Sequence, residues 1–297
     1  MAKLLYTLKI QIWSGHRILL KNLVKLNNFY KRAGTAFFIA ASQITVAFIG
    51  KEAVFVFYAM VAALTLWEFY SLNSLHHVLS NKIAGVTAGL IIYASVFLMY
   101  NNYVETRFSI LLLLVPIVFL LLEMYGNRPK PITNAGFTIF GIIYIILPFS
   151  TLILLTFPPA TNHVYSSGIL IGFLALQWVN DTGAYIVGSR IGKRKLFERI
   201  SPKKTWEGFW GGLVTSVTFA VGFAYFIPEI SLVSWIVISL LIAVFGTLGD
   251  LVESLYKRNL GVKDSGNLLP GHGGFLDRFD SLLFSAPFVF IYLYLFN

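Results

Sequence analysis

The sequence predicts an all-α, polytopic integral membrane protein with about nine transmembrane helices and a cytoplasmic N-terminus. Of its 297 residues, 57% are hydrophobic and only 12% are charged, whereas soluble domains are about 45–50% apolar. Several stretches of roughly 18 residues or more carry almost no charge, which is the length that crosses the hydrocarbon core of a bilayer. The basic residues lie almost entirely on alternate sides of these stretches. Together these observations define the fold class.

The apolar stretches divide the chain into three regions. Residues 1–32 are too polar to cross a bilayer, and their basic residues alternate with apolar ones. They form either a helix lying on an anionic membrane surface or a basic tail that only sets orientation. Residues 33–160 hold five expected spans and residues 161–297 hold four, and most polar residues of the spans fall in this last region. The expected spans are 33–50, 53–71, 83–101, 108–125, 135–157, 167–189, 207–227, 233–251 and 279–296.

The placement of charge sets the expected orientation. With the N-terminus inside, 21 of the 23 Lys and Arg residues fall in inside segments, and only Lys51 and Arg107 fall outside. Cytoplasmic loops of membrane proteins carry this excess of positive charge. The net charge of +10 therefore faces the cytoplasm and its anionic lipids. We expect this positive charge to face the lipid bilayer and not to bind nucleic acid. The absence of cysteine excludes disulfides and thiolate metal sites.

A first polar cluster lies inside the sixth expected span, between Gln177 and Tyr185. An ionisable residue within a span is costly and is by default a functional candidate. Asp181 shares a helix face with Gln177 and Tyr185 because each is four residues away, and Asn180 is adjacent. In the earlier spans, Glu68 and Glu123 lie near the cytoplasmic helix ends, where we interpret both as structural residues that reach the interface.

A second cluster precedes the seventh span. We expect Ser201, followed by Pro202, to cap the helix of that span. A helix N-terminus beside Lys203 and Lys204 is a natural phosphate site. An ordinary positively charged loop would explain the charges, although not the order of Ser, Pro, Lys, Thr and Glu. The candidate residues here are Ser201, Lys204, Thr205 and Glu207.

The third cluster is the densest in charge and runs from Asp250 to Asp280. A solvated loop between two spans is the alternative interpretation. Helical spacing places Asp250, Ser254 and Lys257 on one face. Asp250 ends the eighth span and Asp277 precedes the ninth, so their carboxylates converge if those helices are neighbours. One or two carboxylates together with substrate phosphates are what Mg²⁺ accepts.

A glycine-rich turn lies within the same cluster. Gly271, Gly273 and Gly274 would allow backbone N–H groups to approach an anion closely. His272 is a metal ligand, an acid, a phosphate hydrogen-bond donor or a structural residue, and its neighbours do not decide among these roles. The turn and the two carboxylates predict a site for metal and phosphate.

The segment Ser254–Asp280 resembles the signature of the phosphatidate cytidylyltransferase family, also called CDP-diacylglycerol synthases. That signature is Ser, two residues, Lys-Arg, four residues, Lys-Asp, a spacer to His-Gly-Gly, two residues, Asp-Arg, one residue and Asp. Every fixed position matches. The one departure is Tyr256, where the family has an aliphatic residue or Phe. The resemblance covers about the last 120 residues, including NDTGAYIVGSRIGKRKL and ISPKKTWEGFWGG; residues 1–160 fit only by hydropathy and span count.

The resemblance implies a reaction of phospholipid biosynthesis, in which CTP and phosphatidate give CDP-diacylglycerol and diphosphate. It implies Mg²⁺, with the option of a second cation, and suggests a homodimer. The implied metal ligands are Asp250 and Asp277. The implied catalytic residues are Lys204, Lys257, Arg258, Lys263, Asp264, His272 and Arg278. The implied substrate-binding residues are Asn180, Asp181, Ser201, Thr205, Glu207, Ser254, Gly273, Gly274 and Asp280.

Two other functions remain open at this point. A CTP-dependent lipid kinase of related fold would use similar carboxylates but transfer the γ-phosphoryl group. A transporter is the non-enzyme alternative, for which Asp181 is the only intramembrane candidate. For the cytidylyltransferase, we expect the active site to face the cytoplasm, from the inner membrane if the protein is bacterial. The first five spans would then form a wall and a lateral opening for lipid.

Overall fold

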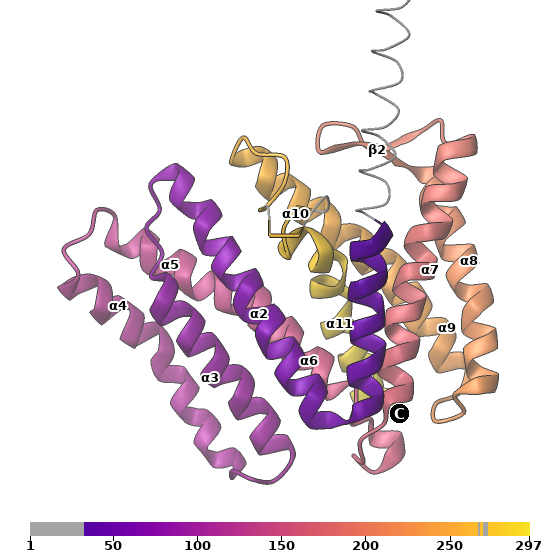
Figure 1. The fold of residues 1–297 in the computed structure, drawn as a ribbon, viewed down its shortest axis with the longest axis horizontal. Helices are drawn as coiled ribbons and strands as arrows, with labels where there is room; N and C mark the ends of the chain where they lie inside the picture. The colour runs from indigo at the N-terminus through magenta and orange to yellow at the C-terminus, as the bar shows by residue number, and fades with distance from the viewer. Residues whose placement is uncertain (1–32, 267, 270–272) are drawn as a thin grey trace, which may run out of the picture.

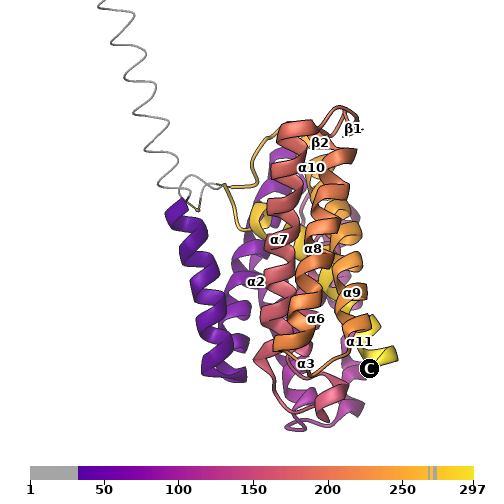
Figure 2. The same cartoon turned by 90° about the vertical axis from the view of Figure 1, so that its right-hand side faces the viewer.

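The computed structural model describes residues 33–266, 268–269 and 273–297 and is a bundle of long helices (Figure 1). The predictions for residues 1–32, Gly271 and His272 lie outside these described residues. The helices run roughly along one common direction, as the second view shows (Figure 2). Within the described part, a helical fold is confirmed, with one short β-hairpin added to it.

The first region consists of consecutive antiparallel helices. A 3₁₀ segment, Thr106–Leu114, leads into α4, and a π-helical segment, Ile142–Ile146, joins α5 to α6 without a break. Short 3₁₀ turns at Ser74–His76 and Pro159–Thr161 follow α2 and α6. The helices are Ala33–Ile49, α2 (Lys51–Asn73), α3 (Lys82–Tyr100), α4 (Val115–Tyr125), α5 (Pro131–Gly141) and α6 (Leu147–Leu154).

The second region also consists of long helices, with a hairpin between α7 and α8. A π-helical segment, Ile242–Gly246, joins α9 to α10. Such segments are rare and frequently accompany functional sites, and this one ends four residues before Asp250. The helices are α7 (Ser167–Ile191), α8 (Trp206–Phe226), α9 (Leu232–Leu241), α10 (Thr247–Asn259) and α11 (Leu276–Phe296).

Membrane insertion is confirmed by the lengths and composition of the helices. Within the described residues, seven helices are long and apolar enough to cross a bilayer. The other two expected spans are helical too, but Ala33–Ile49 is shorter than the others and the polar run in α7 lowers its hydropathy. The protein is therefore a multi-pass integral membrane protein, and the count of nine stays a prediction.

The hydrophobic core runs through both regions. It includes Tyr58 and Phe69 of α2, Phe149 of α6, Phe173 of α7 and Phe279 of α11. The Phe149 and Phe279 rings meet edge to face at a centroid distance of 5.7 Å, an arrangement that aromatic pairs prefer. α11 thus packs against the first region as well as against α10, and the boundary at residue 160 stays a prediction.

A two-stranded hairpin is added to the helical fold. β1 (Lys195–Phe197) pairs antiparallel with β2 (Ser201–Thr205). Ser201 therefore lies in a strand, and the prediction that it caps the next helix is wrong. Thr205 takes that role, because its Oγ1 accepts a hydrogen bond of 3.2 Å from the Gly208 N–H and satisfies one of the free amides of the first turn of α8.

The three polar clusters share one end of the bundle. The hairpin follows the C-terminal end of α7, and it lies at the same end as α10, with the C-terminus at the opposite end (Figures 1 and 2). α11 begins near α10 and runs back toward that opposite end (Figure 1). The fold thus brings residues of α7, β2, α10 and α11 together at one end.

Candidate functional site

A polar cavity of about 310 Å³ lies where α7, α10 and α11 meet at this end. Its basic lining groups are Lys257 and Arg278. Its acidic groups outnumber them, and close carboxylates repel one another unless a cation lies among them. The cavity therefore suits a positively charged group. The aspartates that line it are Asp181, Asp250, Asp264, Asp277 and Asp280.

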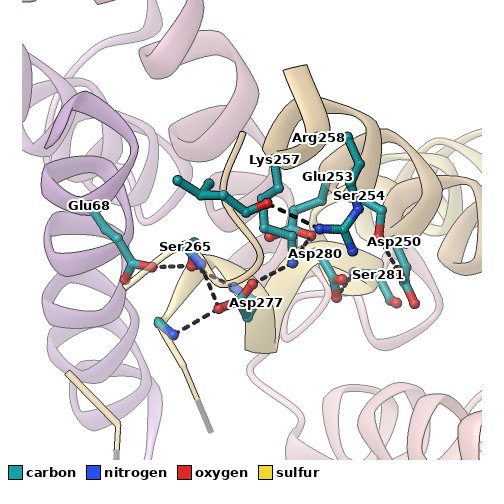
Figure 3. A network of polar contacts seen from close by, with 12 residues as sticks. Glu68, Asp250, Glu253, Ser254, Lys257, Arg258, Ser265, Asp277, Asp280 and Ser281 are labelled. Carbon is teal, nitrogen blue, oxygen red and sulfur yellow. Dashed lines mark hydrogen bonds and ion pairs between the residues drawn. The ribbon is translucent and has the colours of Figure 1, made fainter. Parts of the chain in front are cut away.

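Asp277, in the first turn of α11, is held from three sides (Figure 3). Its Oδ2 accepts hydrogen bonds of 2.9 Å from the backbone N–H of Ser265 and 2.9 Å from that of Gly274. Its Oδ1 lies 2.6 Å from the Lys257 Nζ. Hydrogen bonds to an ionised acceptor are the strong ones, so this carboxylate has a fixed orientation.

Lys257 lies between two buried carboxylates. Its Nζ is 2.6 Å from Glu253 Oε2, one helical turn earlier on α10, as well as 2.6 Å from Asp277. The Glu253 side chain is fully buried, and among the described residues its Oε1 has no hydrogen-bond partner. Buried charges need such partners to offset their desolvation. The three groups therefore depend on one another for their positions.

Asp250 is joined to the hairpin. Its Oδ2 lies 2.6 Å from the Lys204 Nζ of β2, and its Oδ1 accepts a 3.2 Å hydrogen bond from the Ser254 hydroxyl. The neighbouring Gly249 permits close packing, because a Cβ there would lie 2.6 Å from the Asp280 carbonyl oxygen. α10 and α11 therefore approach closely enough for Asp250 and Asp277 to line one cavity, as the sequence predicted.

A second cavity of about 560 Å³ adjoins the first. The two share Asp181, Asp250 and Ser281 in their linings. The second is bounded by α7, α8 and the hairpin, and it has a more apolar lining that includes Tyr185 and Phe209. The remaining predicted residues in its lining are Asn180, Lys204 and Thr205, with Lys195 and Lys203 as further cations.

Seven predicted residues of the described part line neither cavity, and four of them are Ser201, Glu207, Arg258 and Lys263. The exposed Arg258 donates a 3.1 Å hydrogen bond to the Val262 carbonyl. Glu207 accepts hydrogen bonds from the Lys193 N–H at 3.0 Å and the Arg194 N–H at 3.2 Å, and so fastens the base of the hairpin. Lys263 is exposed in the loop after α10, and Ser201 lies in β2.

Gly273, Gly274 and Ser254 support the site without lining either cavity. Gly273 has a left-handed φ of 82°, which glycine adopts without steric cost, and its carbonyl accepts a 3.0 Å hydrogen bond from the Leu269 N–H. Gly274 and Ser254 bond the two aspartates, as described above. The groups that Gly274 and Ser254 contact are thus two carboxylates of the protein, Asp277 and Asp250.

Sequence reasoning missed Glu68 of α2. Its place near a helix end predicts a structural residue that reaches the membrane interface, but its side chain is buried. It contacts Ser265 (Figure 3) and Phe275, both in the segment that leads into α11. The available signal was the carboxylate itself, since an ionisable residue inside a span is a functional candidate. Nothing in the local pattern pointed to its partners.

The donor set fits a hard divalent cation shared with a substrate. Within the residues that the structure describes, no three His, Asp or Glu side chains gather as a complete metal cage. Mg²⁺ is seldom bound in that way, because it takes one or two carboxylates and completes its shell with water and phosphate oxygens. Asp250 and Asp277, on one cavity, satisfy that requirement.

A family model described as the cytidylyltransferase family matches residues 30–296. The chain belongs to the cytidylyltransferase family. This cytidylyltransferase-family chain is 46% identical over 170 residues to the phosphatidate cytidylyltransferase of Bacillus subtilis (strain 168), covering 55% of this chain and 60% of that protein. It is 43% identical over 162 residues to the phosphatidate cytidylyltransferase of Staphylococcus haemolyticus (strain JCSC1435), covering 54% and 59%.

A third cytidylyltransferase relative is matched over a shorter length. The protein of Staphylococcus aureus (strain COL), also named phosphatidate cytidylyltransferase, is 51% identical over 127 residues, which cover 42% of this chain and 48% of that protein. The chain thus spans about half to three-fifths of the length of the curated relatives that it matches. The family confirms the resemblance drawn from the signature.

Proposed function

We propose that this chain is a phosphatidate cytidylyltransferase, which joins CTP and phosphatidate to form CDP-diacylglycerol and diphosphate. The observation that supports this best is the pair of adjoining cavities that share Asp181, Asp250 and Ser281. Two anionic reactants must meet for this reaction, and the shared wall offers a meeting point. The names of the relatives point to the same activity.

The reaction is an in-line displacement at phosphorus. A phosphate oxygen of phosphatidate forms a bond to the α-phosphorus of CTP, and the bond from that phosphorus to the bridging oxygen of the β-phosphate breaks. Diphosphate leaves with the electron pair. Phosphatidate is ionised near neutral pH, so the protein needs no base to activate it. Its main tasks are alignment and the neutralisation of charge.

The residues around the cavities suit these tasks. Lys204 and Lys257 flank the two key aspartates, and Arg278 lines the polar cavity. We assign these three cations to the triphosphate and the departing diphosphate. Asp264 and Asp280 line the same cavity, where we propose that they balance the charge of the cations. Arg258 and Lys263, which line neither cavity, serve the site from its exposed rim.

Asp250 and Asp277 would hold the Mg²⁺ of this reaction, with the option of a second cation. When bound, the metal neutralises phosphate charge and withdraws electrons from the phosphorus. Both aspartates already have their oxygens oriented by neighbouring donors. These supporting contacts are of the kind that tune metal ligands in proteins.

We further propose that the shared end of the bundle faces the cytoplasm, with nine spans and the N-terminus inside. The distribution of Lys and Arg supports this orientation, and it places the site where cytosolic CTP meets a membrane lipid. The first five spans then supply the wall through which the lipid enters. Homodimerisation remains an expectation from the family alone.

Diphosphate release tests the activity directly. The purified protein in mixed micelles should release diphosphate from CTP only when phosphatidate and Mg²⁺ are both present, and in a one-to-one ratio with CDP-diacylglycerol. Diacylglycerol in place of phosphatidate is the matched control, since it lacks the attacking phosphate. Release that is independent of phosphatidate, or none at all from folded protein, would refute the assignment.

A further inference from the structure

The C-terminal half of α2 reaches into the segment that leads to α11. Glu68 is 4% exposed, and its Oε2 accepts a 2.7 Å hydrogen bond from the Phe275 backbone N–H. Its Oε1 accepts a hydrogen bond from the Ser265 hydroxyl. Both carboxylate oxygens thus accept hydrogen bonds from a segment about 200 residues away in the sequence. Two further contacts join α2 to α10, since Phe69 stacks on Tyr256 at 5.2 Å and Asn73 accepts a hydrogen bond from the same tyrosine.

Ser265 connects Glu68 to Asp277. The Ser265 hydroxyl, which donates to Glu68, also accepts a 3.3 Å hydrogen bond from the Asp277 N–H. Its backbone N–H donates to the Asp277 carboxylate at 2.9 Å. A single buried serine therefore separates Glu68 from the aspartate assigned to the metal (Figure 3).

The two nearby glycines leave room for this carboxylate. A Cβ on Gly274 would overlap the Glu68 carboxylate and the Ser265 hydroxyl, and a Cβ on Gly266 would lie 2.9 Å from Glu68 Oε1. Gly274 is not among the glycines with a left-handed backbone. Its missing side chain therefore serves the Glu68 contact rather than the backbone conformation.

We propose that Glu68 is a positioning residue of the active site, acting through Ser265 and Phe275 to fix the orientation of Asp277 and its partner Lys257. This inference rests on the proposed function for its kinetic consequence. A carboxylate is required because both of its oxygens face donors. An amide would turn an NH₂ group toward one of them and leave a buried donor without a partner, which is costly.

The matched control is the other buried carboxylate of the first region. Glu123 of α4 is similarly buried, accepts a 3.2 Å hydrogen bond from Asn134 and lies 3.6 Å from Arg128. All three of these residues lie in the α4–α5 part of the bundle. Glu123→Gln therefore removes the same charge from a similar environment without touching the segment before α11.

The first experiment compares Glu68→Gln, Ser265→Ala and Glu123→Gln in purified protein. Misplacement of reacting groups by about 1 Å costs roughly 10²-fold in rate, so we expect Glu68→Gln to lower kcat by about 10- to 100-fold. The KM for phosphatidate should stay close to the wild-type value, while the melting temperature should fall, because the amide leaves a buried donor without a partner. Ser265→Ala should act in the same direction, and Glu123→Gln should retain kcat. If Glu68→Gln does not fold, Ser265→Ala carries the test alone.

Amide hydrogen exchange supplies a readout that needs no activity. In the absence of substrate, the Phe275 N–H should exchange faster in Glu68→Gln and Ser265→Ala than in the wild type. Its exchange rate should be unchanged in Glu123→Gln. Faster exchange in a protein without cytidylyltransferase activity would refute the proposed function but not the positioning role. Unchanged exchange, with kcat within twofold of the wild type, would overturn the positioning role.

A double-mutant cycle tests the packing directly. Gly274→Ala should reduce kcat strongly, because its Cβ displaces the Glu68 carboxylate. In a Glu68→Ala background the same substitution should cost less, since only the Ser265 hydroxyl is then left to displace. Neighbouring residues couple in this way, whereas independent sites add their free energies. Multiplicative losses in the double variant would contradict the proposal.

Discussion

The Lys257 ammonium joins α10 to α11 through a 2.6 Å ion pair with Asp277. The same ammonium is 2.6 Å from the buried Glu253, so one cation holds two carboxylates beside the polar cavity. Removal of one partner of a buried ion pair leaves an uncompensated charge. Lys257→Met should therefore destabilise the protein by about 3–5 kcal/mol and abolish activity, as measured by thermal unfolding in detergent and by diphosphate release. A variant with wild-type stability would show that the pair contributes nothing.

Asp277→Asn tests the carboxylate more gently, because the amide keeps the size of the side chain. The amide offers one acceptor oxygen to the Ser265 and Gly274 N–H groups, but it loses the charge that the metal and Lys257 require. We expect kcat to fall by roughly 10²–10³-fold, the cost of removing one preorganised electrostatic group. The control is Glu105→Gln, which should remain active. This exposed carboxylate lies just after α3, at the end of the bundle opposite the site. An Asp277→Asn variant with full activity would exclude Asp277 from the metal site.

Lys204 and Asp250 should behave as one unit. Their 2.6 Å contact links the hairpin to α10, so loss of either side chain disrupts both. Lys204→Met and Asp250→Asn should each lower kcat/KM for CTP strongly, and the double variant should be little worse than the poorer single one. Purely additive free energies would instead assign the two residues independent roles. Steady-state kinetics of the four proteins decides between the outcomes.

Metal removal should report on Asp250 and Asp277 together. Chelation should abolish turnover, because the proposed reaction needs Mg²⁺ to neutralise phosphate charge. Added Mg²⁺ should restore turnover. Asp250→Asn should raise the Mg²⁺ concentration for half-maximal activity by about tenfold or more, because loss of a direct ligand should weaken a metal site at least as much as loss of a group that supports a ligand. An unchanged Mg²⁺ requirement in both Asp250→Asn and Asp277→Asn would place the metal elsewhere.

The observed helix cap gives a stability prediction. Thr205→Ala removes the side-chain acceptor of the Gly208 N–H and should cost about 1 kcal/mol, seen as a lower melting temperature. Ser201→Ala, at the position that sequence alone favoured as the cap, should change the unfolding free energy by less than about 0.5 kcal/mol. A larger loss at Ser201 than at Thr205 would contradict the assigned cap.

These residues also show what the sequence can and cannot predict. The Asp250 and Asp277 pair was predictable because helical spacing and the order of the spans place both at one end of neighbouring helices. Ser201 does not cap α8 although Ser-Pro is a strong local signal for a cap, because Ser201 pairs in a hairpin whose short charged strands lack the alternation that marks a sheet. The contacts of Glu68 were not predictable, since Glu68 and Ser265 are 197 residues apart and no local pattern connects them.

The absence of cysteine makes the orientation simple to measure. A single cysteine at Glu198, in the hairpin, should react in intact cells only with a membrane-permeant maleimide. A single cysteine at Arg107, near the opposite end, should also react with an impermeant one. Both positions are exposed, so access depends on the membrane alone. The reverse pattern would invert the proposed topology and place the site outside.

The central claim is that the α-phosphorus of CTP is the atom transferred to lipid. Purified protein should therefore be given phosphatidate and CTP that carries distinguishable labels on its α- and γ-phosphates. We predict that the α-label enters the lipid fraction in one-to-one ratio with the diphosphate released, while the γ-label stays in the aqueous diphosphate. Transfer of the γ-label to lipid would identify a lipid kinase instead, and the absence of both labels from lipid would contradict the account.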